Sequence, residues 1–326
     1  MIFDNIRRKV FSILLFALLA LLLLYSKELF FGISEKAEWR NSVFTGCPDI
    51  LTGKLSAAIS MFMVLVAGML MYKLSFDHIS IMGREHLLVW LWVVPVGGFS
   101  FLHPLSEVHF ATVFILLSYN VLFNVYKRTS DYKAIFLSSM YLGIATFFYS
   151  FAIYLFIPYI ITLYRFKIAG FRDWIISIAG FVVPFYFAIF VFHFLDGNWL
   201  YPIETTLNNI IPDNLSIKIV EMKTSQYIFC AFIAVLTMAG MFMPITLTRQ
   251  GMSQSTISCL RSISTLMFFS VLIYLLFAPE SKLMLQIIFI PATIYLRILF
   301  IKINKNIVAN SLFILLLAAS AITLMS

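Results

Sequence analysis

Long, uninterrupted runs of apolar residues, separated by short polar stretches, dominate the pattern of this chain. Examples are Ile13–Tyr25, Met61–Tyr72 and Tyr227–Met243. A transmembrane β-strand would instead alternate apolar and polar residues over about ten positions. A helix satisfies its own backbone hydrogen bonds inside the hydrocarbon layer. The pattern therefore predicts eleven membrane-spanning helices, at 10–27, 56–74, 87–102, 108–126, 134–149, 151–164, 174–195, 227–247, 264–278, 283–300 and 307–325.

The composition supports the same class of protein. Hydrophobic residues make up 62% of the chain and charged residues only 12%. Soluble domains carry about 25% charged residues, and no soluble fold of this length could hide so much apolar surface. The sequence predicts an all-α, polytopic transmembrane helical bundle, with residues 1–326 forming a single integral membrane domain.

The distribution of lysine and arginine predicts the orientation of the bundle, because cations gather on the cytoplasmic side of membrane proteins. With eleven spans, most of the 23 cations lie inside, and the outer side receives Lys27, Lys36, Arg40, Lys54, Lys218, Lys223 and Lys282. The segments 134–149 and 151–164 could instead form one broken span, but the basic clusters that flank them would then lie on opposite sides. We expect about 11 spans, with the N-terminus in the cytoplasm and the C-terminus outside.

Two outer segments are long enough to hold structure of their own, 28–55 and 196–226. In the second, apolar and polar residues interleave as in a short helix that lies flat at the membrane surface. One interpretation is a platform on which Trp199, Tyr201 and Glu204 bind a lipid-linked substrate. The other is an ordinary lid over the end of the bundle.

A break in the third predicted span directs the chain toward a pair of histidines. Pro95 is followed by two glycines, and the next turn contains His103 and His109. If this turn were helical, His103 and Glu107 would share a face at a spacing that suits two metal ligands, although the proline after His103 disfavours a helix there. Capping at the interface is the alternative. Two ligands do not form a metal site, and we expect none.

Few features indicate ion transport or nucleotide chemistry. Ionisable residues are nearly absent from the predicted spans, and His193 and Arg297 are expected to reach an interface from the ends of theirs. Because buried ionisable residues usually mark ion or proton paths, a proton-coupled transporter is disfavoured. The cytoplasmic segments hold no phosphate-binding loop, and the cations form short clusters rather than one soluble basic face. We expect no cofactor and no nucleic-acid partner.

Acidic residues concentrate on the predicted outer side, and candidate chemistry collects there. Glu28 follows the first span directly, and Glu38 and Asp49 share its loop. A carboxylate at a membrane interface can act as general base toward an acceptor hydroxyl group or coordinate a divalent metal. These three acids are the candidate catalytic residues. The alternative is a solvated loop in which acids pair with neighbouring cations.

Part of the chain resembles a known family. The residues that carry this likeness are Gly143–Tyr149, Pro158, Phe171–Trp174, Gly180 and Pro184. They are similar to an uncharacterised family of polytopic inner-membrane proteins from Bacteroidota, and the likeness covers residues 110–195. It implies the bacterial inner membrane as the location and assigns no activity.

The overall layout also resembles the C-type glycosyltransferases, which use polyprenyl-phosphate sugars. Those enzymes place an acidic residue or an acidic pair just after the first span. Glu28 stands at the matching position, as a single acid after Lys27 rather than a pair. The resemblance implies that Glu28 would be the catalytic carboxylate.

These observations predict a cell-envelope membrane protein, surrounded by membrane lipids, that acts on or binds a polyprenyl-linked glycan at the outer face. Two alternatives stay open. One is a transporter or flippase for a lipid or neutral solute. The other is a non-catalytic subunit of a membrane assembly, with membrane-protein partners.

Overall fold

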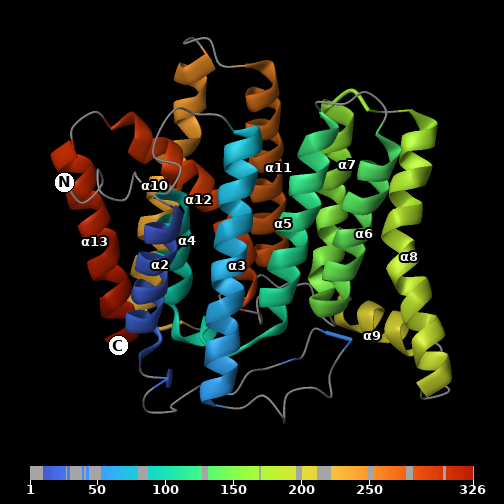
Figure 1. Ribbon diagram of the computed structural model, residues 1–326, viewed down its shortest axis with the longest axis horizontal. Helices are drawn as coiled ribbons and strands as arrows, with labels where there is room; N and C mark the ends of the chain where they lie inside the picture. Colours follow the sequence, from blue (N-terminus) through green and yellow to red (C-terminus); the bar gives the residue numbers. More distant parts are fainter. Residues whose placement is uncertain are drawn as a thin grey trace.

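A computed structural model describes residues 10–26, 28–29, 39, 42–43, 53–79, 87–126, 131–168, 170–195, 200–210, 222–248, 253–276, 282–303 and 306–325. These residues form a helical bundle without β-strands (Figure 1). Its helices are α2 (Val10–Leu24), α3 (Lys54–His78), α4 (Leu87–Gly97), η3 (Ser100–Leu102), α5 (Glu107–Val125), α6 (Tyr132–Phe148), η4 (Ser150–Leu155), α7 (Phe156–Arg165), α8 (Phe171–Leu195), α9 (Tyr201–Ile210), α10 (Thr224–Thr248), α11 (Gln254–Leu276), α12 (Met284–Lys302) and α13 (Asn306–Met325).

Each of the eleven predicted spans coincides with a helix. Within the described residues, seven helices are long and apolar enough to cross a membrane, namely α3, α5, α8, α10, α11, α12 and α13. The other four predicted spans correspond to α2, to α4 with η3, to α6, and to η4 with α7. The chain is therefore a helical, multi-pass membrane protein. The full number of spans and the orientation of the termini stay predictions.

The segments α6 and α7 form a hairpin rather than one broken helix. α6 ends at Phe148, and Tyr149 has extended backbone angles of φ −140° and ψ 102°. The hydroxyl group of Tyr159 on α7 lies 2.8 Å from that of Ser138 on α6, although 21 residues separate them in sequence. A continuous helix would hold these groups about 30 Å apart. The chain must therefore reverse between them, which confirms two separate segments.

A stretch of 3-10 helix lengthens the second arm of this hairpin. A 3-10 helix rises about 2.0 Å per residue, whereas an α-helix rises about 1.5 Å. The six residues of η4 and the ten residues of α7 together extend about 27 Å. This length is close to the roughly 30 Å hydrocarbon core of a bilayer, so a short segment suffices for a span.

The helix α11 begins at Gln254, whereas the predicted span begins at 264. Polar residues at its start concealed this part of the helix. Ser258, Ser262 and Thr265 each donate to the backbone carbonyl four residues before them. Hydroxyl groups that are satisfied inside the helix do not require water. A serine-rich segment can therefore enter the bundle, and hydropathy alone does not detect it.

Glycines allow neighbouring helices to approach closely. α12 lies at the centre of the bundle, in contact with α4, α5, α10 and α11. A Cβ atom at Gly240 of α10 would overlap the carbonyl oxygen of Tyr295 of α12. One at Gly180 of α8 would lie 2.5 Å from the carbonyl oxygen of Phe136 of α6. Small residues at these contacts are typical of membrane bundles, in which close packing replaces the hydrophobic effect.

The segment 196–226 contains the short helix that its pattern predicted, α9. In Figure 1 it lies across the end of the bundle, under α7 and α8. Its contacts are with α6, α8 and η4. Most of the other outer segment, 28–55, lies outside the described residues.

Candidate functional site

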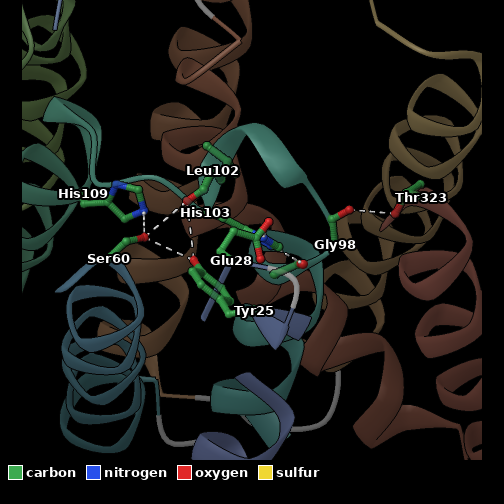
Figure 2. Close-up of polar contacts among 9 residues, drawn as sticks. Tyr25, Glu28, Ser60, Gly98, Leu102, His103, His109 and Thr323 are labelled. Atoms are coloured by element: carbon green, nitrogen blue, oxygen red, sulfur yellow. Dashed lines mark hydrogen bonds and ion pairs between the residues drawn. The ribbon is translucent and has the colours of Figure 1, made fainter. Parts of the chain in front are cut away.

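The end of α4 creates the turn that carries His103. Pro95 disrupts the hydrogen-bond pattern of the helix, and the α-helix ends two residues later, at Gly97. The carbonyl of Gly97 accepts a hydrogen bond from Nε2 of His103 at 2.8 Å. The carbonyl of Gly98 accepts one from Thr323 of α13 at 2.7 Å (Figure 2). The predicted break is confirmed, and the α-helical part of this segment is shorter than predicted.

Helical turns continue beyond α2 and bring Glu28 to the same place. The backbone N–H of Leu29 donates to the carbonyl of Tyr25 at 3.0 Å, so Tyr25 and Glu28 lie about one turn apart. Nδ1 of His103 lies 2.8 Å from Oε1 of Glu28, and the ring of Tyr25 stacks on the imidazole (Figure 2). His103 is fully buried and Glu28 is 5% exposed. We call Tyr25, Glu28 and His103 the Glu28–His103 centre.

The carbonyl of Gly97 identifies which ring nitrogen of His103 is a donor. A carbonyl oxygen only accepts hydrogen bonds, so Nε2 of His103, which lies 2.8 Å from it, carries a hydrogen. Nδ1, on the other side of the ring, lies against Oε1 of Glu28. A partner of complementary chemistry reduces the cost of burying each of these two ionisable side chains.

The second carboxyl oxygen of Glu28 is buried but not paired. Oε2 is buried and has no hydrogen-bond partner among the described residues. An unpaired buried polar group costs about 1–3 kcal/mol, so such an atom favours the binding of a donor. A hydroxyl group bound there would place its hydrogen against a carboxylate whose other oxygen is held by His103. This is the geometry of a general base.

The neighbouring histidine, His109, has a structural role. Ser106 is the N-cap of α5, and the side chains of Ser106 and His109 form a capping box. The backbone N–H of Ser106 donates to Nδ1 of His109 at 3.3 Å. Nε2 of His109 lies 3.0 Å from the hydroxyl group of Ser60 on α3, within hydrogen-bond distance. That hydroxyl group donates in turn to the carbonyl of Leu102 at 3.3 Å.

The capping role predicted for this turn is therefore confirmed for His109. The alternative, in which His103 and Glu107 share a helix face, is wrong. α5 begins only at Glu107, and His103 lies before the N-cap, where it pairs with Glu28. The metal-ligand spacing that a helix would have created between them does not form.

The interior of the bundle holds more ionisable side chains than the sequence predicted. Glu107 is fully buried and Arg297 is 1% exposed. Arg297 donates to the hydroxyl group of Ser75 on α3, so the expectation that it reaches an interface is wrong. The reason is that α12 is surrounded by other helices. The argument against proton-coupled transport, which depended on the scarcity of such residues, loses its basis.

The candidate lipid-binding residues of α9 lie away from the Glu28–His103 centre. Glu204 is exposed, and the ring of Tyr201 lies 5.2 Å from that of Phe192 on α8. α9 contacts α6, α8 and η4, whereas α2 lies across the bundle, beyond α3 and α5 (Figure 1). Both sets of residues nevertheless lie toward the same end of the bundle.

Three other candidate residues, Glu38, Asp49 and Trp199, lie outside the described residues. The partner that sequence reasoning missed is His103. Two signals pointed to it separately: the break at Pro95, which directs the chain toward His103, and the position of Glu28 after the first span. The pairing itself depends on how α2 packs against α4, which no local pattern reveals.

The fold and the centre define a multi-pass helical membrane protein with a buried glutamate–histidine pair toward one end of its bundle. Comparisons with family models, with curated proteins and with solved structures found no match. The basis for a proposed function is therefore the geometry of the Glu28–His103 centre.

Proposed function

We propose that this chain is an inner-membrane protein of the bacterial cell envelope that transfers a sugar from a polyprenyl-phosphate carrier to a glycan acceptor at the outer face. The observation that supports it most is the buried Glu28–His103 pair, which leaves Oε2 of Glu28 available to a hydroxyl donor. The resemblance in layout to C-type glycosyltransferases, with Glu28 at their acidic position, supports the same activity.

Glu28 is the general base of the proposed reaction. The acceptor hydroxyl group donates to Oε2, and its oxygen attacks the anomeric carbon of the donor sugar. A glycosidic C–O bond forms while the bond from the anomeric carbon to the phosphate oxygen breaks, and polyprenyl phosphate leaves with the bonding electrons. The acceptor proton passes to Glu28. His103, whose Nδ1 lies 2.8 Å from Oε1 of Glu28, holds the carboxyl group in position.

α9 is the proposed contact for the lipid carrier. It is a short helix across the end of the bundle (Figure 1), the position of a helix that lies in a membrane interface. Tyr201, Glu204 and the preceding Trp199 would contact the carrier near its phosphate. Glu38 and Asp49 remain additional candidate acids of the outer loop that follows Glu28.

The same pair favours a second candidate function, the proton-coupled movement of a lipid or neutral solute. Buried ionisable residues often mark a proton path in a membrane protein, and Glu28 and His103 are both buried. The two functions differ in their product. Sugar transfer creates a new glycosidic bond, whereas transport leaves the substrate chemically unchanged.

A strain that lacks the gene, complemented with variants, tests the proposal. Mass spectrometry would compare polyprenyl-linked sugars and envelope glycans for the wild type, Glu28→Gln and His103→Asn. We expect Glu28→Gln to lower the transfer rate about 10²–10⁴-fold, so that the polyprenyl-linked sugar accumulates and the matching glycan is lost. The control is Asp77→Asn, because Asp77 is exposed at the far end of α3.

The outcomes separate the two candidates. Unchanged glycans and lipids in the deletion strain would refute sugar transfer. If a polyprenyl-linked sugar accumulates, the purified protein in liposomes is given that lipid together with the acceptor. A new glycosidic bond supports transfer, whereas movement of the intact lipid across the bilayer supports transport.

A further inference from the structure

Five exposed cations lie together at the end of the bundle opposite the Glu28–His103 centre. They belong to the neighbouring ends of α6, α7, α8 and α11 and to the turn before α8, and they are Lys133, Arg165, Lys167, Arg172 and Arg261. Arg165 donates to the carbonyl of Arg261, which joins α7 to α11. Arg172 lies over the ring of Tyr132, 4.3 Å from its centroid, which joins α8 to α6. We call these five residues the basic rim.

The basic rim is held in position by the surrounding backbone. Arg165 also donates to the hydroxyl group of Thr265 on α11. Lys167 has a φ of 60°, which is uncommon for a residue with a side chain, and its N–H donates to the carbonyl of Tyr164 at 3.0 Å. The side-chain contacts of Arg165 and Arg172 restrict their guanidinium groups, whereas the contact of Lys167 fixes its backbone. Such preorganised cations bind anions more tightly than flexible ones.

The positive charge of the rim is not cancelled on its own elements. Among the described residues, two acids lie beside it, and each is engaged with the backbone. Asp131 accepts from the N–H of Ala134 at 3.3 Å and is the N-cap of α6. Asp173 accepts from the N–H of Gly170 at 3.1 Å. Five cations therefore face two acids, which leaves a net positive surface.

Exposed aromatic side chains flank the same cations. Tyr164 is 69% exposed, Phe171 is 83% exposed and Trp174 is 40% exposed. Aromatic rings beside cations are typical of the membrane interface, where the rings lie among the upper acyl chains and the charges reach the headgroups. A free anion or an acidic protein in water would leave these rings uncovered. The combination fits a lipid.

We propose that the basic rim is a binding site for the headgroup of an anionic phospholipid. The phosphate oxygens accept hydrogen bonds from Arg172, Lys167 and the exposed part of Arg165. The acyl chains run along the outer face of α8, where Ile175, Ile178 and Val182 form an exposed apolar stripe. No residue of this site belongs to the Glu28–His103 centre. A result that refutes lipid binding at the basic rim therefore does not affect the proposal of sugar transfer.

Native mass spectrometry of the purified full chain tests this site. The protein is taken from liposomes with equal amounts of phosphatidylglycerol and phosphatidylcholine, and the retained lipids are counted. The rim variant combines Lys133→Gln, Lys167→Gln and Arg172→Gln, and leaves Arg165 to join α7 to α11. The matched control combines Lys54→Gln, Lys223→Gln and Lys282→Gln, which removes equal charge from the starts of α3, α10 and α12.

We expect the wild type and the control to retain phosphatidylglycerol in preference to phosphatidylcholine. The rim variant, which removes three cations, should lose affinity for phosphatidylglycerol about fivefold for each cation, or on the order of 100-fold in total. Arg172→Lys, which keeps the charge and loses the contact with Tyr132, should retain most of the binding. All variants are compared at the same elution volume as the wild type, so that only folded protein is measured.

Three results would overturn the proposal. One is equal retention of phosphatidylglycerol by the rim variant and the wild type. Another is an equal loss in the control, because lipid binding would then follow net charge rather than position. The third is displacement of the lipid by millimolar inorganic phosphate, which would assign the cations to a free anion.

Discussion

The ring of Tyr25 and the imidazole of His103 are stacked, with centroids 4.0 Å apart and planes inclined by 23°. This stacking fixes the plane of the imidazole ring that lies against Glu28. The hydroxyl group of Tyr25 lies 3.2 Å from that of Ser60. Tyr25 therefore acts as a positioning residue through its ring and as a structural link through its hydroxyl group.

Two substitutions at Tyr25 separate these roles. Tyr25→Leu removes the stacked ring, and we expect it to lower sugar transfer about 2- to 13-fold, which corresponds to the roughly 0.5–1.5 kcal/mol of an aromatic pair. Tyr25→Phe keeps the ring and should leave transfer nearly unchanged, while the lost hydrogen bond costs about 1 kcal/mol of stability. The accumulated polyprenyl-linked sugar and the thermal unfolding temperature are the two measurements. Equal effects of both variants on transfer would contradict the positioning role.

Substitution of His109 should affect stability rather than activity. His109→Ala removes half of the capping box of α5 and the hydrogen bond to Ser60. Loss of a helix cap costs about 0.5–2 kcal/mol, so the unfolding temperature in detergent should fall, while the glycan profile stays that of the wild type. The control is His193→Ala, because His193 is exposed near the end of α8. A defect in glycans with normal stability would show that His109 takes part in the chemistry.

Close contact between α6 and α8 depends on Gly180. In Gly180→Ala the new methyl group would overlap the hydroxyl oxygen of Ser139 and the backbone of Phe136, which forces the helices apart. Overpacking of this kind typically costs about 1–3 kcal/mol. Thermal unfolding of the purified protein measures the loss. Ala179→Leu is the matched control, since Ala179 is exposed on the same helix, and it should leave the unfolding temperature unchanged.

Labelling of introduced cysteines tests the predicted topology. In a cysteine-free background, Lys133→Cys and Lys167→Cys flank the α6–α7 hairpin and should react from the cytoplasm. Lys54→Cys at the first residue of α3 and Lys223→Cys just before α10 should react with an impermeant thiol reagent from outside. Reaction of positions 133 and 167 from opposite sides would rule out the hairpin as a pair of spans. If positions 133 and 167 react from outside and positions 54 and 223 react from the cytoplasm, the predicted orientation is reversed. The fold itself would be unaffected by this result.

The helices could be predicted from the sequence because apolar runs are a local signal. The predictions failed where polarity was satisfied locally, as in α11, where Ser258 and Ser262 donate to their own helix. They also failed for Arg297. α12 is apolar nearly all round, so no hydrophobic face indicates that this residue points toward Ser75 on α3. Both cases show that hydropathy measures a residue type and not its neighbours.

The candidate site was predicted only in part. Glu28 was identified because an acid directly after an apolar run lies at an interface. Its partner was not identified, because His103 is 75 residues away in the chain and reaches Glu28 only through the packing of α2 against α4. The turn at Pro95 indicated where His103 would lie, but not what it would meet.

The atom that determines the tautomer of His103 belongs to the backbone. No side-chain substitution can delete the carbonyl of Gly97. A mutation can therefore change the tautomer of His103 only by moving the main chain. The two glycines are where such a movement would start. A Cβ atom at Gly97 would lie 2.6 Å from a methyl carbon of Leu24, and one at Gly98 would lie 2.8 Å from the ring of Phe229. The hydrogen bond between His103 and Gly97 thus has an acceptor that no side-chain substitution removes, and it is vulnerable at the two residues that have no side chain.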